Sequence, residues 1–268
     1  MSRPVVAFLT DFGTRDHYVA AMKGVVLAIC PDAALVDVTH DIPAHDIDAA
    51  GLELAACYKY FPPGTIFVVV VDPGVGSSRR AMAAEAGEHR FIAPDNGVLT
   101  AVFAETPPRR VVDLTDRRYA RPTVSRTFEG RDRFAPAAGW LARGAELSAL
   151  GRPVTTWREI ALVKPRAGER EIEGEVRRVD RFGNLVTNID RRTFDKLTGR
   201  DLADGALEIA AGGHPVRRLV AAYAEAPPGE PCALFGSTDH LEIAINGGSA
   251  AAVLGIGKGA PVRVAIRT

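Results

Sequence analysis

Asp72 and Arg79 are the residues whose types and spacing most clearly suggest chemistry. They lie in VVVVDPGVGSSRR, residues 68–80, where four valines run into an acid, a tight turn and two arginines. Pro73 cannot continue a strand ladder, so Asp72 is expected at a strand's carboxyl end, where ligands bind in open α/β sheets. A carboxylate beside a guanidinium could orient a water molecule or accept its proton there. Alternatively, Asp72 only caps the turn and pairs with Arg79 on the surface.

A second candidate site is TDFGTRDHY, residues 10–18. Asp11 follows a predicted strand, and Gly13 allows a close backbone approach, so the carboxylate could accept hydrogen bonds from two ribose hydroxyls. Alternatively, Asp11 or Thr14 caps a helix that begins near Asp16. DFG also occurs in protein kinases, but no other kinase motif accompanies it here.

Two further polar segments of this half have plainer interpretations. In APDNG, residues 93–97, Asp95 and Asn96 are typical turn residues and are expected to be structural. TFEGRDRFAPAA, residues 127–138, places Glu129 at the approach to a helix, where charged clusters often only solvate a surface.

The carboxy-terminal half contains residues suited to a purine, in VDRFGNLVTNI (179–189) and FGSTDHLEIAINGGS (235–249). The Phe182 ring could stack on a base while the Asn184 amide reads its donors and acceptors. Alternatively, the segment is a hairpin with Gly183 and Asn184 in its turn.

The elements that must position these residues alternate between strand and helix in the first half. Expected strands cover 4–9, 34–38, 68–71, 82–86, 89–93 and 111–114, and expected helices cover about 16–29, about 46–60 and a segment from about residue 133. The first three elements form a βαβ unit. The valine run predicts a central strand covered on both faces.

A polar stretch with proline and glycine separates Leu162 from Glu173. The sequence therefore predicts an α/β sheet domain over 1–165, a linker over 166–170 and a smaller all-β, barrel-like domain over 171–268. Strands of the second domain are expected over 173–179, 185–189, 206–209, 216–223, 232–235, 241–245 and 262–266.

Composition excludes several function classes. The chain of 268 residues has 33 Lys plus Arg and 33 Asp plus Glu, so no overall basic field indicates nucleic acid or an anionic membrane. No leader segment and no apolar run of the roughly 20 residues that a membrane span needs is present. The balanced charge thus favours small-molecule partners. Cys30, Cys57 and Cys232 lie far apart, which argues against disulfides and structural zinc and favours a cytoplasmic protein.

Six ordered motifs across nearly the whole chain resemble the S-adenosyl-L-methionine (SAM) hydroxide adenosyltransferases, a family related to fluorinase and chlorinase. The motifs are TDFGTxD, VDPGVGSxR, APDNG, TFxGRDxFAP, DxFGNLVTN and GSxxxLEIAxNGGSA. The resemblance implies attack of water or hydroxide on the ribose C5′ of SAM, giving adenosine and L-methionine. SAM is then the substrate, and no metal or cofactor is expected. The resemblance also implies a homotrimer, with sites between the amino-terminal domain of one subunit and the carboxy-terminal domain of the next.

The resemblance also implies roles for residues. Asp72, Arg79 and Glu129 would be catalytic, Asp11 would hold the ribose hydroxyls, and Phe182 with Asn184 would bind adenine. Asp180 would meet the methionine ammonium and Ser237 its carboxylate, Tyr223 would give a second stacking face, and the backbone of 245–247 would line the adenine pocket. Besides Asp11, Phe182 and Asn184, the substrate-binding residues that the resemblance implies are Asp16, Tyr18, Gly130, Asp180, Tyr223, Ser237, Glu242, Ile245 and Gly247.

The chain departs from the family pattern at two positions. Hydrolytic members resemble one another in having histidine where this chain has Glu129, which could act as a base, orient Arg79, or point away. Thr238 stands where fluorinases have an arginine. Halide-using relatives have tyrosine in place of Asp72, whose charge would repel halide, so halogenation is disfavoured. The remaining alternative is a non-catalytic protein that binds SAM or adenosine.

Overall fold

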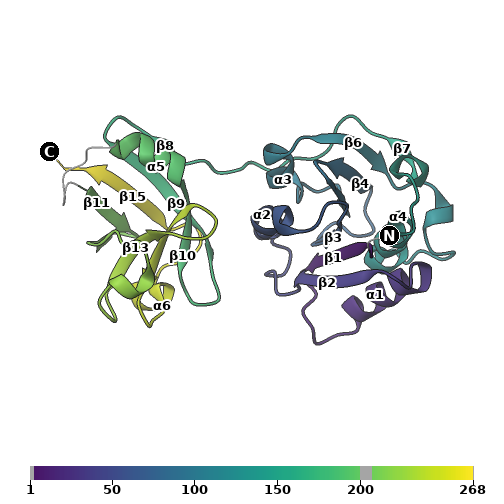
Figure 1. Ribbon diagram of the computed structural model, residues 1–268, viewed down its shortest axis with the longest axis horizontal. Coiled ribbons are helices and arrows are strands. Elements are labelled where there is room, and N and C mark those ends of the chain that lie inside the picture. Colours follow the sequence, from purple (N-terminus) through teal and green to yellow (C-terminus); the bar gives the residue numbers. More distant parts are fainter. Residues whose placement is uncertain (1–2, 200–206, 268) are drawn as a thin grey trace. The chain divides into compact units, whose positions relative to one another are not determined.

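The computed structural model describes residues 3–199 and 207–267. The chain divides into two compact units, Met1–Leu162 and Val163–Thr268, each with its own hydrophobic core (Figure 1). No helix of the described residues is long and apolar enough to cross a membrane.

The first unit is a mixed sheet with helices on both faces. Its strands are β1 (Val5–Thr10), β2 (Ala34–Thr39), β3 (Ile66–Val70), β4 (Ala81–Ala86), β5 (His89–Pro94), β6 (Pro108–Asp113) and β7 (Arg152–Pro153). Its helices are α1 (Tyr18–Ile29), α2 (Ile47–Cys57), α3 (Thr100–Glu105) and α4 (Ala135–Ala142). The strand order is β2-β1-β3-β5-β4-β6-β7, with β2, β1, β3 and β5 parallel and the other pairings antiparallel. The predicted βαβ unit is confirmed, whereas α3 was not predicted.

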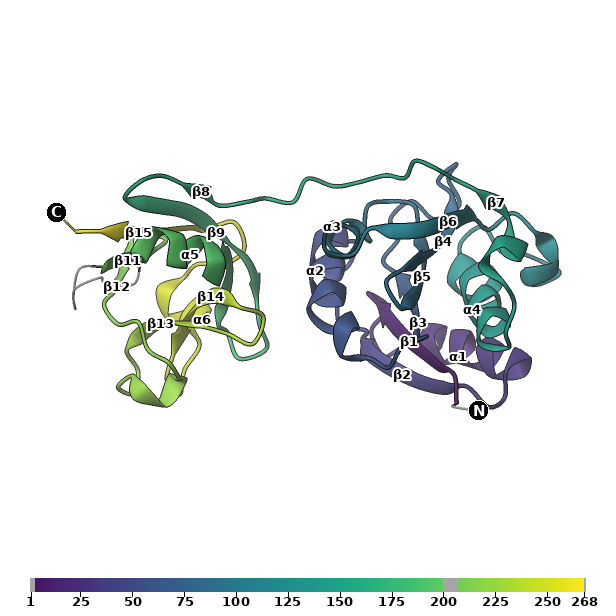
Figure 2. The ribbon, with the colours of Figure 1, turned by 45° about the horizontal axis from the view of Figure 1, so that its top comes forward.

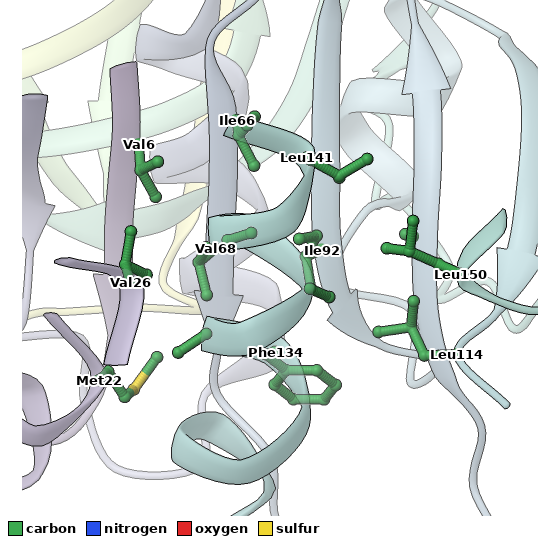
Figure 3. Packing of buried hydrophobic residues seen from close by; sticks show 14 of the residues in the cluster. Val6, Met22, Val26, Ile66, Val68, Ile92, Leu114, Phe134, Leu141 and Leu150 are labelled. Atoms are coloured by element: carbon green, nitrogen blue, oxygen red, sulfur yellow. The ribbon is translucent and has the colours of Figure 1, made fainter. Parts of the chain in front are cut away.

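The valine strand β3 is central, between β1 and β5, and all of its residues are buried. Val68 and Val70 pack in the cluster that includes residues of α1 and α4, shown around Val68 and Phe134 in Figure 3. Phe67 and Val69 belong to the opposite cluster, which includes residues of α2 and α3. Figure 2 shows these two helices on the other side of the sheet from α1 and α4. The prediction of a strand covered on both faces is therefore confirmed. The parallel strands β1, β2, β3 and β5 end at one edge, so the residues that follow them gather there.

The second unit is an antiparallel, nearly closed barrel-like sheet, which confirms the predicted fold class. Its strands are β8 (Arg166–Ala167), β9 (Glu171–Val179), β10 (Leu185–Asp190), β11 (Leu207–Ala211), β12 (His214–Val216), β13 (Pro231–Phe235), β14 (His240–Ile245) and β15 (Pro261–Ile266). The order is β12-β11-β15-β9-β10-β14-β13, and β8 pairs with β9. Leu219, in the segment that follows β12, bridges Ala233 of β13, so the chain leaving the first strand of this order pairs with the last strand.

The strand predicted over 216–223 is wrong, because this segment pairs with two strands in succession. β12 pairs with β11 and ends at Val216, and Val220 N then donates to Ala233 O of β13 at 2.9 Å. The chain must bend between these partners, and a short 3₁₀ turn, Tyr223–Glu225, follows.

Two short helices of the second unit, α5 (Arg191–Thr198) and α6 (Ala250–Leu254), were not predicted. Asp190 begins α5 by accepting a hydrogen bond from Thr193 N at 2.7 Å, and Ser249 begins α6 in the same way. Ala206, in the strand predicted over 206–209, lies outside the described residues.

Candidate active site

Asp72 and Arg79 form a buried ion pair at the carboxyl end of β3. Arg79 Nε donates to Asp72 Oδ1 at 3.0 Å, and Nη2 contacts Oδ2. The Arg79 and Asp72 side chains are only 8% and 5% exposed, which excludes a pair on the surface. Paired Nε and Nη2 contacts fix the orientation of the carboxylate as well as its charge.

The turn that returns Arg79 to Asp72 depends on Gly76. Its φ is +77°, and an added Cβ would lie 2.4 Å from Arg126 O. Arg126 Nη2 donates to Gly76 O at 3.1 Å, so the turn packs against the loop that leads to Glu129. Any side chain at this position would separate the two segments.

Glu129 does not point away from Arg79. Its Oε2 lies 2.5 Å from Arg79 Nη2, and its Oε1 lies 3.3 Å from Arg133 Nε. Oε2 is buried, and within the described part of the chain its partner is the Arg79 guanidinium, which it meets as an ion pair and not through a well-aligned hydrogen bond. Glu129 therefore lies between two cations and keeps an acceptor for another donor.

A π-helical turn, Gly130–Phe134, follows Glu129 directly and leads into α4. Such turns occur mostly as single turns inside α-helices and often at functional sites. Gly130 is buried, and an added Cβ would lie 3.1 Å from Met22 Sδ, so a larger residue would press on α1.

The charges around Arg79 favour its protonated form. Burial alone lowers the pKa of Arg79, but hydrogen bonding and attraction to Asp72, followed by attraction to Glu129, raise it above the ordinary value. The guanidinium also lies 5.6 Å from the centroid of the Phe134 ring. Arg79 is thus a permanent cation at this edge of the sheet.

Asp95 and Asn96 hold the same edge together. Arg80 Nε donates to Asp95 Oδ2 at 2.8 Å, and Asn96 Nδ2 donates to Val71 O at 2.9 Å. Asn96 therefore anchors the backbone next to Asp72, in agreement with the structural role expected for it.

Asp132, in the same GRD segment as Glu129, also has a structural position. It is fully buried and accepts hydrogen bonds from Arg131 and from Ser125 N. Burial raises its pKa, but Arg131, Ser125 and Arg121 outweigh burial and lower it. Asp132 fixes the loop before Glu129.

Asp11 lies directly after β1, with Oδ2 accepting from His45 N at 2.9 Å. The helix α1 begins only at Tyr18, after His17 and without a side-chain cap, so neither Asp11 nor Thr14 caps it. Asp16 is exposed just before the helix.

Tyr18 connects this segment to the loop before Glu129. Its ring centroid lies 5.2 Å from that of Phe128 and 5.6 Å from that of Phe12. The structure therefore brings the segment 10–18 and the segment 127–138 together.

In the second unit, Asp180 organises the turn between β9 and β10. Its Oδ1 accepts from Phe182 N and Asn184 N, each at 2.8 Å, and its Oδ2 accepts from Asn184 Nδ2 at 2.9 Å. Gly183 has φ +85°, and an added Cβ would lie 2.0 Å from Ser249 Oγ. The hairpin alternative is thus correct as local structure. It leaves Phe182 78% exposed, so its ring is open to contact with a ligand.

Tyr223 and Glu242 form a second polar pair in this unit. Tyr223 Oη donates to Glu242 Oε2 at 2.8 Å. Burial, followed by Glu242 and then Asp180, raises the pKa of Tyr223 to about 12. An added Cβ at Gly236 would lie 1.8 Å from Glu242 Oε1, so only glycine leaves room for this carboxylate.

The other predicted residues of the second unit lie in turns or in the core. Ser237 is exposed in the turn between β13 and β14. Ile245 is buried in the hydrophobic core, so only its backbone could line a pocket. Gly247 lies in the following turn, where Gly248 N donates to Ile245 O at 3.1 Å.

Sequence reasoning missed two groups of residues at the edge of the first sheet. Arg133 was considered only as the approximate start of a helix, although its i,i+4 spacing from Glu129 is a signal for an ion pair. Thr10 and His40 were also missed, and their bond joins the ends of β1 and β2. A polar residue at each strand end was the available signal.

Comparison with known proteins shows what this arrangement resembles. Residues 6–151 match the model of the SAM hydroxide adenosyltransferase N-terminal domain, and residues 174–263 match that of the C-terminal domain. A relative from Thermus thermophilus named (R)-S-adenosyl-L-methionine hydrolase is 40% identical, over 98% of this chain and 99% of the relative. One of the same name from Salinispora tropica is 37% identical, over 97% of each chain. A fluorinase from an Actinoplanes species is 28% identical, over 91% of each.

A solved structure shows the same fold. A crystal structure of an uncharacterized conserved protein from Thermotoga maritima matches with a TM-score of 0.91 and 35% sequence identity, over 97% of this chain and 99% of that one. The chain therefore belongs to the SAM hydroxide adenosyltransferase family.

Proposed function

We propose that this chain hydrolyses S-adenosyl-L-methionine to adenosine and L-methionine by attack of water on the ribose C5′. The hydrolase names of its relatives support the reaction. The observation that carries the proposal for the site is the buried cluster of Asp72, Arg79 and Glu129 at the carboxyl edge of the parallel strands.

The proposed chemistry needs little from the protein besides alignment. A water oxygen forms a bond to C5′ while the C5′–S bond breaks, and its electron pair returns to sulfur as the neutral thioether of methionine. One proton leaves the attacking water. The sulfonium is already an excellent leaving group. The residues therefore need mainly to hold the attacking water in line with the C5′–S bond and to replace the hydration shell of that water with fixed hydrogen-bond partners. The proposal therefore includes no cofactor.

Asp72 suits the orienting role. Arg79 engages both carboxylate oxygens, yet a carboxylate has about four lone-pair positions, so Asp72 can also accept a hydrogen bond from water. Arg79 remains cationic and stabilises developing hydroxide character. Glu129 holds Arg79 in place, and its Oε2 is a second acceptor for the departing proton.

The substrate-binding roles follow the family resemblance. Asp11 would hold the ribose, Phe182 and Asn184 would bind adenine, and Asp180 would meet the methionine ammonium. We also propose a homotrimer, with each site built from the first unit of one subunit and the second unit of the next. A cytoplasmic location remains a proposal that rests on cysteine usage.

The decisive experiment is incubation of the purified protein with SAM in ¹⁸O-water plus chloride, with products separated by liquid chromatography and identified by mass spectrometry. Adenosine labelled at the C5′ oxygen would establish direct water attack, whereas 5′-chloro-5′-deoxyadenosine would establish halogenation. No product despite measurable adenosine binding would establish a binding protein. Running both sulfonium epimers separately tests the (R) preference that the names of the relatives suggest.

A further inference from the structure

A second polar network lies at the carboxyl edge of the first sheet. Thr10 Oγ1 lies 2.9 Å from His40 Nδ1, and His40 Nε2 lies 2.8 Å from Asp37 Oδ1. Lys23 Nζ of α1 donates to Asp37 Oδ2 at 2.6 Å. Thr10 is fully buried and His40 is 6% exposed, so the network begins inside the sheet and ends at the surface.

The hydrogen-bond directions in this network follow from Asp37. Burial raises the pKa of Asp37, but Lys23 and His40 outweigh burial and lower it, so its carboxylate only accepts. His40 therefore donates from Nε2, and in a neutral ring Nδ1 accepts from the Thr10 hydroxyl. Thr10 Oγ1 can then accept from Phe12 N, which lies at 3.2 Å.

The arrangement superficially resembles a hydrolytic triad, but its geometry excludes that role. In a serine-type triad the nucleophile meets Nε2 and the acid meets Nδ1, whereas here the two nitrogens are exchanged. Thr10 is also closed to solvent, so no substrate carbonyl can reach its hydroxyl. The network therefore holds structure in place and does not attack a substrate.

The structure held in place is the segment that carries Asp11. Thr10 holds Phe12 N, and His40 O accepts from Gly13 N at 2.8 Å. These two hydrogen bonds fix the backbone N–H groups of the two residues that follow Asp11, whose Oδ2 accepts from His45 N on the chain that follows His40.

We infer that His40 is a positioning residue that, through Thr10, sets the Asp11 carboxylate for the two ribose hydroxyls of the substrate. The inference rests on the proposed function, because the role of Asp11 belongs to it. Its consequence concerns the ribose hydroxyls specifically, and not the affinity for the base.

The test compares binding of adenosine with binding of 2′,3′-dideoxyadenosine by isothermal titration calorimetry. The affinity for adenosine divided by the affinity for 2′,3′-dideoxyadenosine reports recognition of the two hydroxyls. Losses of affinity common to both ligands cancel in this ratio. Thr10→Val keeps the shape of the side chain and removes only the hydroxyl, and Thr10→Ser is the matched control that keeps it. The ratio is expected to fall about three- to tenfold in Thr10→Val, as for loss of one well-oriented hydrogen bond, and to be retained in Thr10→Ser.

His40→Asn and Asp11→Ala complete the series, with thermal unfolding measured for every variant. His40→Asn is expected to lower the ratio as Thr10→Val does, and it decides the question should Thr10→Val not fold. If Asp11→Ala lowers the ratio while the network variants retain it, the positioning role is wrong. If the unmodified protein shows no ratio above one or no SAM turnover, the proposed function itself fails first.

Discussion

The two units of the chain hold their carboxylates in different ways. In the first unit, Asp72 and Glu129 contact the guanidinium of Arg79, so opposite charges offset one another. In the second unit, Asp180 accepts from backbone and amide N–H groups, and Glu242 accepts from a phenol. Neutral donors orient a carboxylate without cancelling its charge. This contrast agrees with the roles proposed above, in which the second unit attracts the cationic substrate and the first acts on a water molecule.

Removal of the Arg79 guanidinium from the first unit should have the largest effect on stability and turnover. Arg79→Met leaves two buried carboxylates facing each other, so the free energy of unfolding should fall by about 3–5 kcal/mol. The turnover number should fall by about 10²–10³, as when one donor is removed from a preorganised site. Chemical denaturation and steady-state kinetics with SAM measure the two effects. Arg79→Lys, which keeps the charge but not the planar fork, should recover more stability than turnover.

Asp72→Ala tests whether this carboxylate acts on water. The turnover number should fall by about a hundredfold, in the range of a lost general base, while the dissociation constant of adenosine changes less than about twofold. Kinetics and calorimetry on the same preparation give both values. Equal losses in turnover and adenosine binding would assign Asp72 to structure and remove the contrast between the two units.

Asn184→Ala tests base recognition in the second unit. Adenosine binding should weaken by about 1–3 kcal/mol, because a buried base edge loses its partner. Asn188 is the matched control, since it is a similarly buried asparagine on the strand that begins just after Asn184, and its side chain bonds to the backbone of Glu175 and Val163. Asn188→Ala should reduce stability and spare adenosine affinity. Unchanged adenosine affinity in Asn184→Ala would remove this residue from the site.

The smallest expected effect concerns Tyr223 at high pH. Its pKa of about 12 in the folded protein exceeds the value of about 10 for an unfolded tyrosine. The folded state therefore retains this proton longer, and the associated stability is present below pH 10 and lost as the pH rises through 12. Urea unfolding between pH 9 and 12 should show a steeper loss in the unmodified protein than in Tyr223→Phe. Parallel curves would contradict the pKa difference.

Sequence patterns predicted the parts of the fold that local physics determines. The valine run indicated a buried strand, and the proline and glycine that follow Asp72 indicated where that strand ends. The segment 216–223 failed because its hydrophobic pattern does not reveal a change of pairing partner between β11 and β13. That change is a property of the whole barrel.

The site shows the same limit. Proximity of Asp72 and Arg79 was expected from a short turn, but their burial depends on the loop that packs against Gly76. The contact between Glu129 and Arg79 joins segments 50 residues apart, and local pattern left it open. Tertiary packing decided both.

The π-helical turn over Gly130–Phe134 makes the direction of the Glu129 side chain depend on the number of residues in the turn. Such a turn holds one residue more than an α-helical turn, and each residue advances an α-helix by about 100°. Deletion of a single residue from the turn would therefore swing Glu129 about 100° around the axis of α4 and away from Arg79. The turn also contains the buried residues Gly130, Asp132 and Phe134, so its length determines the packing of the core at this point as well as the direction of the Glu129 carboxylate.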